Sequence, residues 1–151
     1  MKRILYFLTF LFISTFTYSQ TQESPVKWTV NEPVAYEGGF IINVIAEIDK
    51  DWYIYGMQME EGGPLPLLIN FENVVELIEK YEVEELSKAE IVFDEIFGMN
   101  VTSHSHLAEI KCFFVPKPGV ALLNLIIDGQ ACNKKDGSCM PVYEIITIEI
   151  K

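Results

Sequence analysis

The segment Val142-Tyr-Glu-Ile-Ile-Thr-Ile-Glu-Ile150 has the alternation of a β-strand with one buried face. From Ile146 onward, isoleucine alternates with a threonine and a glutamate. Successive side chains of a strand point to opposite faces, so the isoleucines share one face and the polar residues share the other. We therefore expect a half-buried strand here.

Similar runs, rich in β-branched and aromatic residues, occur upstream, and turn-forming residues such as Gly38-Gly39 and Asp128-Gly129 separate them. Short strands with a turn about every ten residues are typical of a sandwich of two sheets. The sequence therefore predicts an all-β protein with an immunoglobulin-like β-sandwich. The upstream runs are residues 26–30, 40–48, 52–55, 67–71, 110–115 and 120–127.

The segment 74–86 is ambiguous. Its apolar residues first follow helical spacing, but the next two positions of that stripe are Glu82 and Glu85. Since an amphipathic helix needs a continuous apolar stripe, the pattern favours a strand over residues 74–78 followed by a polar loop.

The N-terminus has the order of a secretory signal. Met1-Lys2-Arg3 is basic, Ile4 to Ile13 is apolar, and small or neutral residues lead to Ser19. This order predicts a cleavable signal peptide over residues 1–19, one domain over residues 20–151, and a periplasmic or secreted location. An uncleaved anchor is less favoured, because a membrane-spanning helix needs roughly 20 apolar residues. After cleavage we expect no membrane span.

The chain is strongly acidic, with 22 Asp and Glu against 11 Lys and Arg, which gives a formal net charge of −11. Nucleic acids and anionic lipids also carry negative charge. The composition therefore argues against both as partners.

Cys132 and Cys139 bracket a six-residue polar loop between two strand-like runs. A chain reversal there would bring the cysteines within reach of a disulfide. The bond is either a structural staple or a redox pair, and the spacing leaves both open. Lys134 and Lys135 would favour a reactive thiolate, whereas Asp136 has the opposite charge.

Two weaker signals lie elsewhere. Cys112 stands in an apolar run, where a buried and inert thiol is expected. His104 and His106 would share one face of a strand, but two histidines are too few for a structural zinc site. We expect an exposed polar strand there and no metal.

Three motifs, in order along the chain, resemble a known family. They are Asp51-Trp-Tyr-Ile-Tyr55, Asp94-Glu-Ile-Phe-Gly98, and the segment from Gln130 through Cys139 to Pro141. The sequence resembles the N-terminal periplasmic domain of the thiol:disulfide interchange protein DsbD. The resemblance runs from about residue 25 to residue 151.

The resemblance implies an immunoglobulin-like domain that exchanges electrons through a mixed disulfide, without a cofactor. Its partners would be thioredoxin-like periplasmic proteins and a separate membrane transporter of reducing equivalents. It would act as a protein-disulfide reductase component, a role associated with cytochrome c biogenesis. The residues implied are catalytic Cys132 and Cys139; a cap loop of Asp94, Glu95, Ile96 and Phe97; and neighbouring Tyr53, Tyr55, Lys134 and Lys135.

Two other functions remain open on the residues alone. One is a non-catalytic binding or adaptor sandwich whose disulfide is only structural. The other is a carbohydrate-binding module, because Trp28, Trp52 and Tyr53 have rings that can stack on a sugar.

Overall fold

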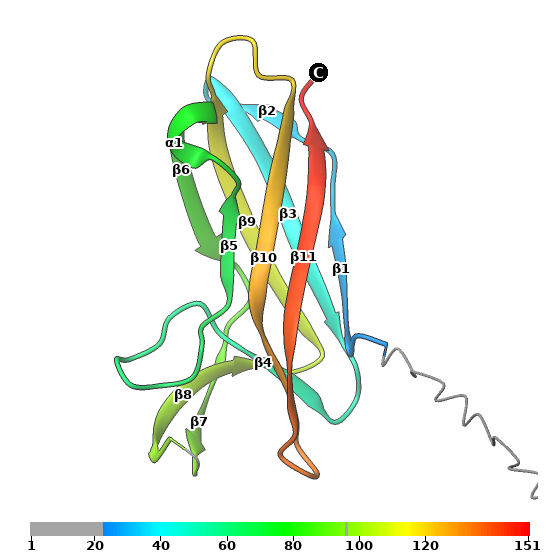
Figure 1. Ribbon diagram of the computed structural model, residues 1–151, viewed down its shortest axis with the longest axis vertical. Coiled ribbons are helices and arrows are strands. Elements are labelled where there is room, and N and C mark those ends of the chain that lie inside the picture. The colour runs from blue at the N-terminus through cyan, green and yellow to red at the C-terminus, as the bar shows by residue number, and fades with distance from the viewer. Residues whose placement is uncertain (1–22, 96) are drawn as a thin grey trace, which may run out of the picture.

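Two antiparallel β-sheets pack against each other in the computed structural model, which describes residues 23–95 and 97–151 (Figure 1). The predicted signal peptide and Ile96 lie outside the described residues. The first sheet has the order β1 (Val26–Val30), β3 (Gly39–Ile48), β9 (Leu107–Pro116) and β6 (Ile78–Glu85), and β2 (Val34–Tyr36) pairs with β3.

The second sheet has the order β11 (Cys139–Glu149), β10 (Leu122–Asn133), β4 (Trp52–Tyr55), β8 (Met99–His104) and β7 (Glu90–Asp94). A further strand, β5 (Leu68–Phe71), pairs with β10. The all-β sandwich predicted from the alternating runs is therefore confirmed.

The core lies between the sheets and is built by the inward-facing residues of the long strands. Val44 on β3, Ile110 and Phe114 on β9, and Leu125 and Ile127 on β10 belong to one buried cluster. Full burial of such a side chain contributes about 1.5–3 kcal/mol. Alternation in the sequence thus reflects real burial on one face of each strand.

The prediction for residues 74–86 was wrong. A one-turn helix, α1 (Val74–Leu77), comes first, and β6 then runs through the segment that was expected to be a polar loop. On β6, half-buried Tyr81 and Val83 alternate with exposed glutamates, and the strand pairs with β9. A register shift between Ile78 and Lys80 breaks the two-residue period, which made the spacing resemble a helix.

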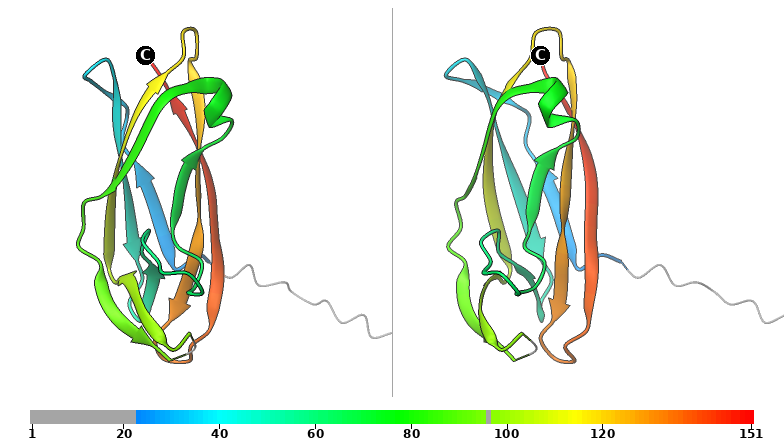
Figure 2. Two further views of the ribbon diagram at one scale, coloured as in Figure 1. Left: turned by 90° about the vertical axis from the view of Figure 1, so that its left-hand side faces the viewer. Right: turned by 60° about the vertical axis from the view of Figure 1, so that its left-hand side comes forward.

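Strands that the sequence did not predict determine one end of the sandwich. The β7–β8 hairpin lies beside the β10–β11 hairpin, at the end opposite α1 (Figures 1 and 2). β10 and β11 also extend beyond their predicted bounds, to Asn133 and to Cys139. Both cysteines therefore stand on strands.

Within the residues that the structure describes, no helix has the length and apolar character needed to cross a membrane.

Candidate functional site

Cys132 and Cys139 form a disulfide at the end of the β10–β11 hairpin. They stand directly opposite each other in the strand register, and their Cα atoms are 4.1 Å apart. The next residue pair is hydrogen-bonded, because the backbone N–H of Asn133 donates to the carbonyl of Ser138 (2.8 Å). The cysteines therefore occupy a non-hydrogen-bonded position, where opposite Cα atoms approach most closely.

The loop between the cysteines is closed by its own polar side chains. Asn133 Oδ1 accepts a hydrogen bond from the backbone N–H of Lys135 (2.8 Å). Asp136 Oδ1 accepts from the N–H (2.9 Å) and the hydroxyl (2.6 Å) of Ser138, and these bonds lower the pKa of Asp136. Gly137 follows with a positive φ of 71°, which glycine adopts without strain. These residue types explain the reversal at this position.

The two loop lysines connect the hairpin to neighbouring turns. Lys135 Nζ forms an ion pair with Asp51 Oδ2 (2.6 Å), and this contact lowers the pKa of Asp51. Lys134 Nζ donates to Ser105 Oγ (2.7 Å), and the Lys134 N–H donates to the carbonyl of Asp51 (2.7 Å). The structure thus places both lysines in the predicted loop, with their ammonium groups directed to Asp51 and Ser105.

The two cysteines differ in exposure. Cys132 is 0% exposed and belongs to a small buried cluster with Tyr55 and Val101, whereas Cys139 is exposed. Cys132 Sγ lies 3.9 Å from the hydroxyl oxygen of Tyr55. Of the two cysteines, Cys139 is therefore the residue open to solvent.

A buried polar pair lies behind Cys132. The Tyr55 hydroxyl donates to Asp94 Oδ2 (2.9 Å), and Asp94 is buried. Tyr53, which pairs with Cys132 across the β4–β10 register, brings its hydroxyl within 3.4 Å of the Tyr55 hydroxyl. Burial, with the contacts to Tyr53 and Asp94, raises the pKa of Tyr55, so this residue stays a neutral donor.

The predicted cap loop is the turn of the β7–β8 hairpin. Asp94 ends β7 and Glu95 follows as an exposed residue. The N–H of Phe97 donates to Asp94 Oδ1 (3.3 Å), and the N–H of Gly98 donates to the Asp94 carbonyl (2.8 Å). Phe97 is exposed, and Ile96 lies outside the described residues. The structure thus brings Asp94 and both tyrosines to the disulfide, and shielding by the cap remains a prediction.

A groove of about 590 Å³ separates the β7–β8 hairpin from the disulfide loop. One wall carries Val92 and Asp94 of β7, and the other carries Lys134 and Gly137 of the loop, with Tyr53 also lining the groove. The groove therefore lies next to the disulfide.

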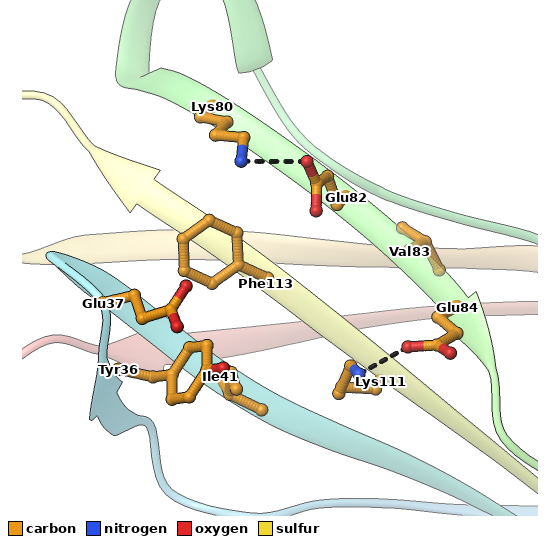
Figure 3. Close-up of a pocket in the computed structure, with 9 residues that line it drawn as sticks. All are labelled: Tyr36, Glu37, Ile41, Lys80, Glu82, Val83, Glu84, Lys111 and Phe113. Carbon is orange, nitrogen blue, oxygen red and sulfur yellow. Dashed lines mark ion pairs between the residues drawn. The ribbon is translucent and has the colours of Figure 1, made fainter.

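A larger groove of about 770 Å³ lies on the first sheet, away from the disulfide (Figure 3). Its charged groups pair with one another: Lys80 with Glu82 at 2.9 Å, and Lys111 with Glu84. Lys80 Nζ also stands 5.2 Å from the centre of the Phe113 ring. Because its lysines are already paired and it lies on the other sheet from the disulfide, this groove is not the candidate site.

The expectation of an exposed polar strand at the two histidines was wrong. His104 ends β8, is buried, and is hydrogen-bonded through Nε2 to Glu85 Oε1 (2.8 Å). His106 is exposed and stands beyond β8 with a positive φ of 73°, so the two do not share a strand face. The pairing of β8 with β4 buries His104, and that long-range contact is not encoded in the local pattern.

Comparisons with known proteins bear on the fold. No protein-family model matches the sequence, and no curated protein sequence matches it. The reduced N-terminal domain of DsbD from Neisseria meningitidis superposes with a TM-score of 0.54 at 23% identity, covering 80% of this chain and 83% of that chain.

Two further solved structures are similar. The N-terminal periplasmic domain of ScsB from Proteus mirabilis gives a TM-score of 0.59 at 13% identity, over 82% of this chain and 45% of that chain. A chain from the complex between the DsbD and PilB N-terminal domains of Neisseria meningitidis gives a TM-score of 0.52 at 18% identity, over 77% of this chain and 78% of that chain. The structural resemblance expected from the three motifs is thus confirmed: this chain has the fold of DsbD N-terminal domains.

Proposed function

We propose that this domain carries out thiol-disulfide exchange through Cys132 and Cys139. The asymmetry of the disulfide supports this proposal most strongly. One sulfur is buried against the Tyr55 hydroxyl and the other belongs to an exposed residue at the end of a hairpin. A disulfide with a purely structural role does not need an exposed cysteine. Thiol-disulfide exchange does need one, because a thiolate of the partner must reach one of the two sulfurs.

The exchange proceeds in two balanced steps. A thiolate of a reduced partner attacks Cys139 Sγ, the bond between the two cysteines breaks, and Cys132 leaves as a thiolate. The second thiolate of the partner then attacks the partner's own sulfur in the mixed disulfide and releases Cys139. The partner becomes a disulfide, and this domain gains two electrons and two protons. Every step is reversible, so the reduced domain can reduce an oxidised partner.

The surroundings of Cys132 limit its reactivity after reduction. Cys132 is fully buried and contacts the Tyr55 hydroxyl, which donates to Asp94. Oxidation of a thiol requires access of the oxidant to the sulfur. We infer that burial slows the chance oxidation of Cys132 in the reduced domain.

Partners follow by analogy with the similar structures. One of them holds a DsbD N-terminal domain in complex with a PilB N-terminal domain, and another is described as periplasmic. We infer thioredoxin-like periplasmic partners and a membrane transporter that supplies reducing equivalents. The turn at Asp94, Glu95, Ile96 and Phe97 would shield the pair between encounters.

The order of attack is tested with single-cysteine variants in a Cys112→Ala background. In Cys132→Ala and in Cys139→Ala, the remaining cysteine is activated with thionitrobenzoate, which a thiolate displaces with a colour change. The probe is a reduced thioredoxin whose second active-site cysteine is serine. We expect Cys139 in the Cys132→Ala variant to form the mixed disulfide at least tenfold faster than Cys132 in its counterpart. Equal rates, or no mixed disulfide with either variant, would contradict the proposal.

A further inference from the structure

Strand β7 forms an open edge of the second sheet. It is the last strand in the order β11-β10-β4-β8-β7, and among the described residues it pairs with β8 alone. In an antiparallel pair, backbone N–H and C=O groups point alternately toward the partner and away from it. About half of the backbone groups of β7 therefore face outward, where another strand can pair with them.

The three central side chains of β7 do not protect this edge. Ile91 is 74% exposed, Val92 39% and Phe93 64%, with no lysine or proline among them. Natural proteins usually place charges or proline on an open edge to prevent pairing. Edge strand β6 of the first sheet follows that rule, because Lys80 and Glu82 on it are exposed and charged. The exposed apolar run on β7 is therefore typical of an interaction site.

The position of β7 links this edge to the disulfide. Val92 and Asp94 form one wall of the groove of about 590 Å³ whose other wall is the loop residues Lys134 and Gly137. Asp94 also accepts the hydrogen bond of Tyr55, whose hydroxyl contacts Cys132. A chain that adds to β7 would thus lie along the rim of the candidate site.

The charges around β7 restrict the occupant. Glu90 begins the strand and Glu95 follows it, and both are exposed. A segment that carries basic residues at its two ends complements them. A second copy of this chain does not, because symmetric antiparallel pairing centred on Val92 would set Glu90 against Asp94 of the copy. Like charges directly opposite each other destabilise a strand pair.

We propose that β7 is a docking edge for an extended segment of the exchange partner, which adds to the sheet as one more strand. The segment has β-branched or aromatic residues in its middle and a lysine or arginine at each end. This inference rests on the proposed function for its biological role. The added strand itself is measurable without any redox chemistry.

The test uses the full chain with its disulfide intact and a synthetic, thiol-free peptide, Lys-Thr-Val-Thr-Val-Thr-Lys. Amide hydrogen exchange is followed by NMR, because a new strand protects the outward N–H groups of β7. We expect at least tenfold slower exchange at those amides, and unchanged exchange on β6. Two control peptides, one with glutamate at both ends and one with a central proline, should bind at least tenfold more weakly. No protection of β7, equal protection of β6, or equal binding of the control peptides would overturn the proposal.

Side-chain variants provide a second test of peptide binding to β7. Ile91→Thr/Phe93→Thr keeps strand propensity while removing apolar surface, and should weaken peptide binding at least fivefold. The matched control is Tyr143→Thr/Ile145→Thr on edge strand β11, where the two natural side chains are 58% and 52% exposed. This control variant should bind the peptide as tightly as the unmodified chain does. Equal loss in both variants would contradict the assignment to β7.

The two proposals fail separately. An inert disulfide with a protected β7 edge refutes the exchange function and leaves the docking edge standing. An active disulfide with an unprotected edge refutes only the docking edge.

Discussion

Tyr55 connects the buried sulfur to the buried carboxylate at the candidate site. Its hydroxyl contacts Cys132 Sγ at 3.9 Å and donates to Asp94 at 2.9 Å. Asp94 also accepts the N–H of Phe97, so one carboxylate links the turn of the β7–β8 hairpin to the disulfide. A change at this hydroxyl therefore affects both the turn of the β7–β8 hairpin and the surroundings of the disulfide.

Replacement of Tyr55 by phenylalanine tests this connection. The change leaves a buried carboxylate with one donor fewer, which costs about 1–3 kcal/mol of unfolding free energy. Tyr53→Phe is the matched control, because Tyr53 is only half-buried and water can replace its hydroxyl. Urea unfolding of the oxidised proteins should show the larger loss for Tyr55→Phe. Equal losses would contradict the special role of Tyr55.

Cys112 provides a contrast within the same chain. It is 0% exposed on β9, and burial raises the pKa of its thiol to about 12. Since the thiolate is the reactive form, iodoacetamide at pH 8 should leave Cys112 unmodified in the folded protein and alkylate it after denaturation. Mass spectrometry of the two samples checks this, and rapid labelling of the folded protein would show that the site opens readily.

The expectation of a buried thiol at Cys112 came from its apolar neighbours and is confirmed, whereas its inertness stays a prediction. The contact of Tyr55 with Cys132 had no such local signal, because 77 positions separate the two residues. Only the family resemblance placed the tyrosines near the cysteines.

At the scale of elements, the hydrogen bond between Glu85 and His104 links the end of β6 in one sheet to β8 in the other. Glu85 Oε1 also accepts the N–H of Met57 (2.9 Å). Burial alone would raise the pKa of Glu85, but the hydrogen bonds from His104 and Met57 outweigh it and lower the pKa below its usual 4.5. The charged form of Glu85 is therefore stabilised by folding.

This lowered pKa has a consequence for stability. The contribution is fully present above the unfolded-state pKa and is lost as pH falls through the lower folded-state value. The unfolding free energy of the natural chain should therefore drop as pH falls below about 4.5, and Glu85→Gln should show a shallower drop. Urea unfolding between pH 3 and pH 7 measures both slopes. Parallel slopes would contradict the role of Glu85.

Element boundaries followed the alternating pattern only where one face is clearly apolar. β11 was predicted because its isoleucines alternate with polar residues, yet its extension to Cys139 depends on pairing with β10. β7 was not predicted, because its three central apolar residues show no alternation and are exposed. Such an edge strand is determined by its neighbour β8, which local sequence does not reveal.

At the scale of the whole molecule, one buried cluster joins both sheets and does not depend on the disulfide. The bond closes a loop of sequence separation seven, which contributes about 2–3 kcal/mol in the chain-entropy account. The fold is therefore expected to survive reduction, as a cycling pair requires.

A double replacement, Cys132→Ser/Cys139→Ser, tests this independence. The variant should remain folded and lose about 2–3 kcal/mol of unfolding free energy in urea. In the strands of the core cluster, amide exchange should stay as slow as in the unmodified chain. The exchange rates should change mainly in the β10–β11 hairpin. Loss of the folded state would show that the disulfide is a structural staple.

A disulfide that cycles between oxidised and reduced forms differs from a structural bond in its reduction potential. The oxidised full chain is equilibrated in glutathione and dithiothreitol buffers of known potential, and the fraction of Cys132–Cys139 disulfide is measured after acid quenching and alkylation. We expect a midpoint between about −120 and −270 mV, the range of thioredoxin-like exchange proteins. A midpoint below about −300 mV is that of a structural bond and would show that the disulfide does not cycle.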